Sequence, residues 1–431
     1  MGCILHALGT TVNKKRLDSW KSIAVFLGRS LRTVQRWHEC NGLPVHHFGG
    51  HKGSVFAYEE EINQWFLNVS AGSCAVEARV EETLESGKRS SCQLTATANE
   101  MWETRSERNI HSIADLYRKA IADDSRNAAA YAGLAKAILF CSLFDMIDGS
   151  VAYPSAVEAL RRMPQIDSEH LDTKCSAAWI DVLYSRNWRQ ARAGFEEILS
   201  KRPTSFALAG MAALHIAEGN ILKAKGYAWE AWRLNPLVSS LGGILCWAMY
   251  LNGDFQHVLD LVAQIRSGGG NSAFLTAVEA LALIQEGSIS GKLAHLERAA
   301  SDFPQNQTLH GILGYACGIS GSKARAQDLY AHMARQSEPN RKSNGYALAI
   351  LSIGLGNKQE AIEWLENAYA EGSLWSLGFR SDPMLKPLAG DPCFIRLANK
   401  IGGTTHYCAE TEFKRPETPS FLESALVGES I

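Results

Sequence analysis

NWRQARAGFEEILSKRPTSFALAGMAALHIAEGNILKAKGYAWEAWRLNP, residues 187–236, contains one pattern twice. Each copy places small or apolar residues along one helix face and ends in proline: Ala191, Phe195, Ile198 and Pro203 in the first copy, and Ala224, Ala228, Ala231 and Pro236 in the second. Ala224 lies 33 residues beyond Ala191, a period that is typical of stacked helix pairs. Because small residues let two helices approach closely, the pattern predicts a mainly α-helical array.

Degenerate copies of the pattern extend the array in both directions. They are NGDFQHVLDLVAQI (252–265), SGSKARAQDLYAHMARQSEP (320–339) and GNKQEAIEWLENAYAEG (356–372), with an earlier unit that ends near Tyr117 and Ala120. The body resembles an α-solenoid of tetratricopeptide repeats, and residues 187–265 look especially like the repeats attached to bacterial regulators and cyclases. We expect about six to eight repeats over residues 109–400.

The end of the array is also predicted from a resemblance. SDPMLKPLAGDPCFIRLANKIG (381–402) looks like the capping segment of such arrays, although Cys393 stands where arginine is usual. The resemblance implies a concave surface that binds a partner protein, a peptide or a ligand, or that holds the protein as a homo-oligomer. The sequence does not identify the groove residues, since most aromatic and small side chains of such arrays belong to the core.

The N-terminal part of the chain is basic, whereas the rest is acidic. The charged residues between positions 14 and 56 are Lys14, Lys15, Arg16, Lys21, Arg29, Arg32, Arg36 and Lys52 against Asp18 and Glu39. They sum to +6, so the remainder of the chain must carry −8 to give the formal net charge of −2. This asymmetry indicates a nucleic-acid partner for the N-terminal part.

Two short helices joined by a tight turn are predicted in this basic region. Ser19 can cap a helix whose buried positions are Trp20, Ile23, Ala24 and Leu27, and Gly28 ends it. Ser30 caps a second helix, Leu31–Cys40, with Leu31, Val34 and Trp37 on its buried face and Arg32, Gln35, Arg36 and Glu39 opposite, beside Thr33. This arrangement is a helix-turn-helix pattern.

A β-hairpin is predicted after the second helix. LPVHHF (43–48) and SVFAY (54–58) are short strand-like runs on either side of GGHKG (49–53). Lys52, with His47 or His51, would lie at or near the hairpin tip, where it suits backbone phosphates. A third helix then begins at Glu59 and packs back through Ile62, Trp65 and Phe66.

Residues 17–66 resemble the winged helix-turn-helix domains of the excisionase/MerR-like class. The resemblance is closest to the version at the head of bacterial tetratricopeptide-repeat proteins, and it is carried by LGRSLRTVQRW (27–37), GLPVH (42–46) and GSVFAY (53–58). It implies binding of double-stranded DNA, and a role in transcription regulation, through the helix that starts at Ser30 and through the wing. The candidate DNA contacts are Arg29, Ser30, Arg32, Thr33, Gln35, Arg36, His47, His51 and Lys52.

The residue types on the second helix suit base reading. Arginine can donate two hydrogen bonds to guanine, and glutamine can pair in the same way with adenine. Ser30 and Thr33 lie where the N-termini of recognition helices meet phosphates and base edges. The alternative is a scaffold or adaptor in which both parts of the chain bind proteins, because small helix-turn-helix folds also serve as protein-interaction modules.

Neither a metal site nor an enzyme is expected. His38, His46, His47 and His51 lie near Cys40, but they lack the paired spacing of zinc ligands, and adjacent strand residues point to opposite faces. GSISGKL (287–293) has three residues between its glycines where a phosphate loop has four, and Leu293 stands where that loop needs serine or threonine. We therefore expect no cofactor.

The remaining segments complete the predicted domain organisation. Residues 1–13 are expected to be a flexible N-terminus, 14–68 the winged helix-turn-helix, 69–108 a flexible linker rich in Ser, Glu, Ala and Thr, 109–402 the array, and 403–431 a disordered tail. The ten cysteines form no C-x-x-C pair, and no apolar run approaches the ~20 residues of a membrane span. These observations favour a cytoplasmic protein.

Overall fold

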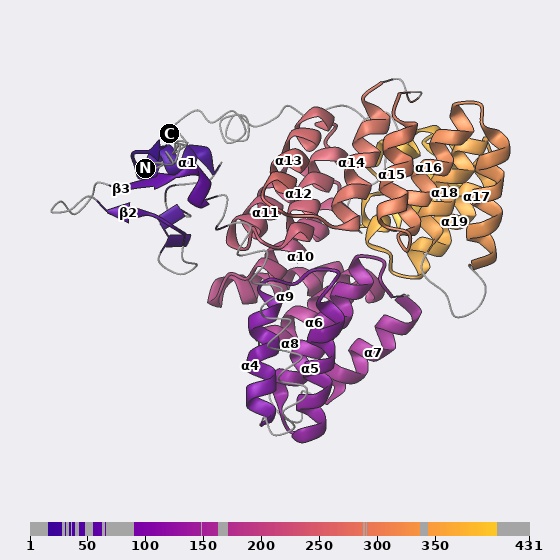
Figure 1. Cartoon of the computed structure of the whole chain (residues 1–431). Coiled ribbons are helices and arrows are strands. Elements are labelled where there is room, and N and C mark those ends of the chain that lie inside the picture. Colours follow the sequence, from indigo (N-terminus) through magenta and orange to yellow (C-terminus); the bar gives the residue numbers. More distant parts are fainter. Residues whose placement is uncertain are drawn as a thin grey trace, which may run out of the picture. The chain divides into compact units, whose positions relative to one another are not determined.

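The computed structural model describes residues 16–402 except 28–30, 32–33, 36, 39–42, 48–54, 63–64, 66–89, 148, 163–170, 288, 290 and 337–343. The chain divides into two compact units, which are described separately (Figure 1). The described part of the first unit spans residues 16–65, and that of the second spans 90–402. Among the described residues no helix combines the length and the apolar character that crossing a bilayer requires.

The first unit contains a small sheet and a capped helix. Strands β1 (Arg16–Leu17), β3 (Val55–Tyr58) and β2 (His46–His47) form a three-stranded sheet in that order, with both pairs antiparallel. Helix α1 (Trp20–Phe26) begins at Ser19, whose hydroxyl accepts a hydrogen bond from the Ser22 amide at 3.0 Å. The predicted hairpin pairing and the predicted cap are confirmed. The strand β1 was not predicted, because two residues are too few to show an alternating pattern.

The core of the first unit follows the predicted stripes closely. The buried side chains are Ile23, Ala24, Leu27, Val34, Trp37, Leu43, Val45, Val55, Ala57, Ile62 and Trp65. The described residues between 31 and 38 are helical, in agreement with the predicted second helix. The prediction was wrong for Leu31, which is 47% exposed, because it lies one turn before Val34 and beyond the edge of so small a core.

The second unit is a succession of helix pairs. Its paired helices are α4 (Ser91–Trp102), α5 (Ile110–Asp123), α6 (Ala128–Leu143), α7 (Gly149–Arg161), α8 (Leu171–Ile180), α9 (Trp188–Lys201), α10 (Ser205–Ala217), α11 (Ile221–Leu234), α12 (Ser239–Leu251), α13 (Phe255–Ser267), α14 (Ala273–Gln285), α15 (Leu293–Asp302), α16 (Gln307–Ile319), α17 (Lys323–Gln336), α18 (Gly345–Leu355) and α19 (Lys358–Ala370), and a single helix, α20 (Pro392–Asn399), follows them. In the described part of the chain they form eight consecutive pairs, and α8 is extended by the π-helix η1 (Asp181–Ser185).

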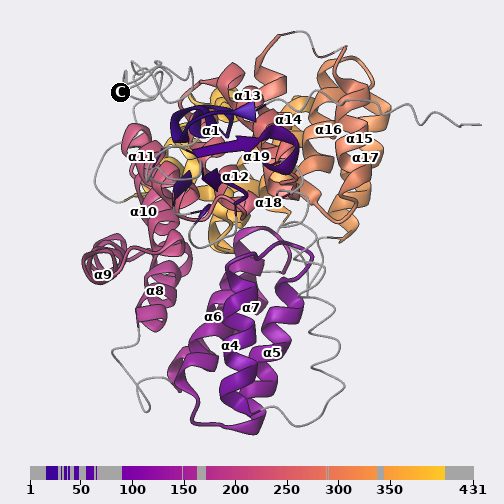
Figure 2. The ribbon, with the colours of Figure 1, turned by 60° about the vertical axis from the view of Figure 1, so that its left-hand side comes forward.

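The pairs stack so that neighbouring helices share a continuous core. Each helix packs against its partner, and the first helix of a pair also contacts the first helix of the next, as α6 does with α8 and α16 with α18. Figures 1 and 2 show α4 to α7 side by side, and α15 to α17 in the same way. We call the face formed by the first helices of the pairs the inner face. This arrangement confirms a helical-repeat body.

The array begins earlier than the sequence predicted. The predicted linker, 69–108, is wrong over its last part, because α4 lies within it and packs against α5. Leu94, Ala98, Met101 and Trp102 are buried, and the Ser91 hydroxyl donates to the Ala120 carbonyl at 2.7 Å. The apolar residues have helical spacing, but the many Ser, Thr, Gln and Asn residues between them give the segment the composition of a linker.

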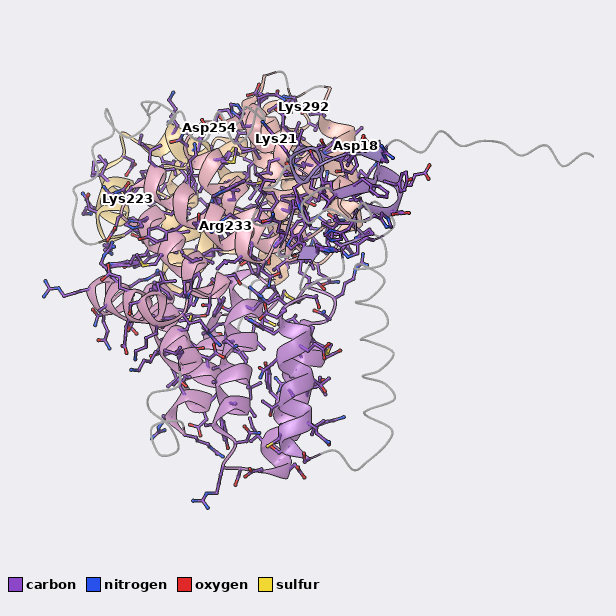
Figure 3. The ribbon with its side chains drawn as sticks, turned by 90° about the vertical axis from the view of Figure 1, so that its left-hand side faces the viewer. Asp18, Lys21, Lys223, Arg233, Asp254 and Lys292 are labelled. Carbon is purple, nitrogen blue, oxygen red and sulfur yellow. The ribbon has the colours of Figure 1, made fainter. Side chains whose placement is uncertain are left out.

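Small residues and a buried ion pair hold neighbouring pairs together. The predicted core positions Ala191, Phe195 and Ile198 on α9 and Ala224, Ala228 and Ala231 on α11 are all buried. Lys225 on α11 donates to the Asp254 carboxylate at 2.5 Å, and both side chains are at least 98% buried (Asp254 is labelled in Figure 3). Asn252 donates to the same carboxylate at 2.9 Å. A buried charge pair needs such additional hydrogen bonds to offset its desolvation.

The contact between α16 and α18 depends on glycine. A side chain at Gly311 or Gly318 would overlap the backbone of Ala347 or Gly354 on α18. A side chain at Gly314 would overlap Leu351. Glycine at these three positions of α16 therefore allows the two helices to approach more closely than alanine would.

We expect Gly318→Ala to destabilise the array by about 1–3 kcal/mol, because the added methyl group forces the helix backbones apart. Thermal unfolding followed by circular dichroism measures the effect. Gly226→Ala is the matched control, since α11 has open space at this position and alanine favours a helix by about 0.5–1 kcal/mol. Equal effects of the two substitutions would contradict the close approach.

Candidate functional site

The first unit exposes two of the predicted DNA contacts. Gln35 is helical and exposed, while its neighbour Val34 and the nearby Trp37 are buried. The helical segment therefore has a buried face and an exposed face, as predicted. His47 lies exposed on β2. The rings of His47 and His38 are 5.6 Å apart, so β2 and the helical segment that carries Gln35 lie beside each other. Lys21 adds an exposed cation on α1 (Figure 3).

The other predicted DNA contacts lie outside the described residues. They are Arg29, Ser30, Arg32, Thr33, Arg36, His51 and Lys52. His38, which the sequence analysis considered only as a metal ligand, is an additional member of this surface. Its Nδ1 lies 2.9 Å from the Leu43 carbonyl, and its ring meets Trp20 edge to face at 5.6 Å. Its position three residues after Gln35 is the sequence signal that could have identified it.

The histidines of the hairpin have different neighbours. His46 Nε2 lies 2.5 Å from Glu61 Oε2, and the His46 ring stacks on Phe56 at 5.1 Å. His47 instead faces His38. Nowhere in the described ranges do three His, Cys, Asp or Glu side chains converge in a way that could hold a metal ion.

The first unit also exposes large apolar side chains. Val25 and Phe26 on α1 are 62% and 36% exposed, and Leu31 is 47% exposed. Scattered apolar residues are normal on a protein surface, but three of them within one small unit are compatible with a protein contact.

In the second unit, the C-terminal part of the chain covers the inner face of the array. Residues 373–388, which we call the strap, contain two 3-10 turns, η2 (Leu374–Gly378) and η3 (Pro383–Leu388). The strap packs against α10, α18 and α19, and nearly all of its side chains are buried. The sequence predicted a concave binding surface and a capping segment over residues 381–402. The strap fills much of this surface, because it is apolar enough to be buried there, and the predicted capping segment forms η3 and α20 against α19.

The indole of Trp375 is the centre of the strap. Its ring stacks on Tyr346 of α18 at 5.0 Å, and it meets Phe274 of α14 and Trp247 of α12 at 5.0 and 5.7 Å. Aromatic pairs at these separations stabilise beyond the area that they bury. One strap side chain thus joins three helix pairs of the array.

A buried carboxylate fixes the second half of the strap. Asp382 accepts hydrogen bonds from the Tyr250 hydroxyl at 2.8 Å, the Tyr346 hydroxyl at 2.6 Å and the Met384 amide at 2.9 Å. Burial raises the pKa of Asp382, although these hydrogen bonds oppose the shift. Burial beside this carboxylate also raises the pKa of both tyrosines well above the ordinary value.

We expect Tyr346→Phe to lower the stability of the array by about 1.5–3 kcal/mol, because a buried carboxylate loses a hydroxyl donor while the aromatic ring is kept. Thermal unfolding of the full chain measures the loss. Tyr153→Phe, at a tyrosine that is 41% exposed on α7, serves as the control and should change stability by less than about 0.5 kcal/mol. A loss no larger than that of the control would mean that the Tyr346 hydroxyl does not stabilise the strap.

Two polar side chains hold the first half of the strap. Asp145, in the turn after α6, accepts a hydrogen bond from the Trp375 indole at 3.0 Å, and the Thr308 hydroxyl lies 3.5 Å away. Arg186, after η1, donates to the Tyr369 carbonyl at 2.7 Å and lies 3.5 Å from the Ser376 hydroxyl. Burial raises the pKa of Asp145 to about 7 and lowers that of Arg186 to about 10.

The first helix pair also reaches across the array. In the turn between α4 and α5, Glu107 accepts a hydrogen bond from the Ala273 amide at the start of α14, at 2.8 Å. Trp102 meets Phe206 of α10 edge to face at 5.5 Å. Burial raises the pKa of Glu107. These contacts join helix pairs that lie far apart in the sequence.

A polar cavity of about 390 Å³ remains at the start of the array. It is lined by Asn99, Ala129, Leu171, Asp172 and Arg202, which come from α4, α6, α8 and the residue after α9. Asp172 pairs with Lys136 at 2.8 Å. The sequence analysis named none of these residues, since polar positions on repeat helices carry no distinctive pattern.

Comparison with known proteins gives little further information. No family model and no curated protein matches the chain. Among solved structures, the human IFIT1 dimer with PPP-AAAA is similar over 82% of this chain and 81% of that chain, with 13% identity and a TM-score of 0.35. The TPR domain of P58(IPK) is similar over 74% of this chain and 99% of that chain, with 12% identity and a TM-score of 0.19. These TM-scores are too low to show a common fold, so the description of the array rests on its own helices.

Proposed function

We propose that the protein binds double-stranded DNA through its first unit, as a winged helix-turn-helix, and that it acts as a transcriptional regulator and not as an enzyme. The observation that carries the proposal is the order of elements around Gln35. A capped helix precedes a helical segment with Val34 and Trp37 buried and Gln35 exposed, and an antiparallel hairpin follows. The same region carries the concentration of arginine and lysine that phosphate binding requires.

The array has the second role in this proposal, which is to receive a partner protein or to hold the regulator as an oligomer. Since the strap covers much of the inner face, we propose that a partner contacts the outer helices or the open start of the array. Helical-repeat bodies offer extended surfaces for such contacts.

Equilibrium binding of the full chain to duplex DNA, measured by fluorescence anisotropy over a range of salt concentrations, tests the DNA-binding proposal. We expect Arg32→Ala and Arg36→Ala each to weaken binding by about 1–3 kcal/mol if the side chain reads a base. If the side chain instead contacts a phosphate, its removal should lower the slope of log affinity against log salt concentration by about one. Gln35→Ala should reduce discrimination at one base pair and leave the salt dependence unchanged.

Lys323→Ala removes the same charge from an exposed position on α17 and is the control. It should leave DNA binding unchanged. Binding to duplexes no tighter than to other polyanions at moderate salt, or equal losses for Lys323→Ala and Arg36→Ala, would overturn the proposal.

The second candidate function is that of an adaptor whose two units both bind proteins. The exposed Val25, Phe26 and Leu31 favour it. In that case Val25→Ser combined with Leu31→Ser should abolish capture of the partner, whereas neutralising Arg32 and Arg36 should not. Cross-linking and pulldown with the two variants separate this function from DNA binding.

A further inference from the structure

The turns inside the helix pairs share one backbone conformation. Five of them contain a glycine with positive φ, at intervals of 34 or 35 residues: Gly219 (74°), Gly253 (83°), Gly287 (106°), Gly321 (92°) and Gly356 (90°). The left-handed region is readily open to glycine and costly for other residues. The turn within each of these five pairs therefore requires a left-handed residue, whereas the described turn between α4 and α5 contains none.

Two earlier turns meet this requirement without glycine. Asp145 between α6 and α7 and Arg186 between η1 and α9 both have φ of 55°, and no other non-glycine residue in the described part of the chain has positive φ. Arg186 also follows a π-helix, which is itself uncommon. Strained residues persist only where surrounding contacts compensate for the strain.

The compensating contacts are those with the strap. Asp145 accepts from the Trp375 indole, and Arg186 holds the Tyr369 carbonyl directly before the strap, together with the Ser376 hydroxyl. Glycine could supply the turn but neither side chain. The two departures from the glycine pattern are thus also the two polar anchors of the strap's first half.

We propose that the strap is a latch on the inner face of the array, anchored by Asp145 and Arg186, and that it loosens when Asp145 loses its proton. The latch lies entirely within the second unit, so it does not depend on whether the first unit binds DNA.

Burial and two acidic neighbours favour the neutral form of Asp145, whereas its two hydrogen-bond donors favour the charged form. The charged side chains that act on it are both acidic, Glu371 at the end of α19 and Glu107 in the turn between α4 and α5. The donors are Trp375 from the strap and Thr308 from α16. The nearby cations have other contacts: Arg108 acts on Glu107, and Arg186 is bound to backbone carbonyls of α19 and η1.

The sign of the pH dependence follows from the shift. The pKa of Asp145 is about 7 with the strap in place, against an ordinary value of 3.8 once it is exposed. Protonation therefore favours the latched form. The stabilisation of the latched form by protonation of Asp145 is complete below about pH 4, decreases between about pH 4 and pH 7, and is lost above about pH 7. Each unit of pKa shift changes the equilibrium between the latched and loosened forms about tenfold.

Hydrogen–deuterium exchange of the full chain between pH 5 and pH 8, corrected for the intrinsic exchange rate, tests the latch. We expect protection of the strap to fall by at least about tenfold over this range, relative to peptides from α12 and α13. Asp145→Asn keeps an oxygen acceptor for Trp375 and removes the charge, so its strap should stay protected at every pH. A wild-type strap without pH dependence, or an equal dependence in Asp145→Asn, would overturn the proposal.

Two further variants test the latch if Asp145→Asn fails to fold. Trp375→Phe removes the indole donor that favours the charged form, so the loss of protection should move to higher pH. Arg186→Gly keeps the left-handed turn but removes the guanidinium, and should speed strap exchange by at least about tenfold at every pH while the pH step remains.

Arg189→Ala, which removes an exposed arginine from α9, is the control for Arg186→Gly and should leave strap exchange unchanged. Unchanged strap exchange in Arg186→Gly would show that Arg186 only forms the turn, and it would contradict a two-anchor latch. If the pH at which strap protection is lost were the same in Trp375→Phe as in the wild type, the role of Asp145 would be contradicted.

Discussion

The burial of Trp375 within the inner face is the interaction on which the second unit depends. Three aromatic side chains from α12, α14 and α18 surround its ring, and its single polar atom has a partner in Asp145. In an open array each helix pair contacts only its neighbours, so the stability of the array is a sum of contributions from single pairs and from the contacts between adjacent pairs. The strap contacts several distant pairs at once, so the stability of one pair depends on that of the others. The array is therefore expected to unfold more cooperatively than an open solenoid of the same length.

The same interaction limits where the array can bind other molecules. In a helical-repeat body the first helices of the pairs provide the surface that is most enclosed, and here much of this surface is already occupied by the chain. The aromatic side chains that would attract an apolar peptide are in contact with Trp375 and Phe379. Binding at this surface would require displacement of the strap, whereas binding at the outer helices would not. The two possibilities differ in cost, because only the first must overcome the strap's buried contacts.

The first unit has a different physical basis. Its core is small, with ten or so side chains around Trp37 and Trp65, whose rings lie 5.7 Å apart. A unit with so small a core leaves much of its surface exposed, and the described cations Arg16 and Lys21 lie on that surface. The proposed DNA-binding role of this unit and the helical body are consistent with the opposite formal charges of the two parts of the sequence.

Local patterns in the sequence were sufficient for much of this structure. The small residues of α9 and α11, the cap at Ser19 and the pairing of β2 with β3 could all be predicted, because each depends on neighbours within a few residues or one turn. Leu31 and α4 were predicted wrongly because burial at the edge of a small core, and helix formation by a polar segment, depend on what packs against them. The sequence did not identify the groove residues, and all nine candidate DNA contacts stay predictions.

What the sequence by itself determined is the repeating unit, that is, a period near 34 residues with small residues where the two helices meet. What only the tertiary structure decided is how the array ends. Asp145 and Trp375 are 230 positions apart, and no periodicity connects them. Their contact exists because the strap packs back against helices of earlier pairs and so meets the turn that carries Asp145. The departures from glycine at positions 145 and 186 were not predicted, because they are recognised only from the backbone conformation of the turns and from the contacts with the strap.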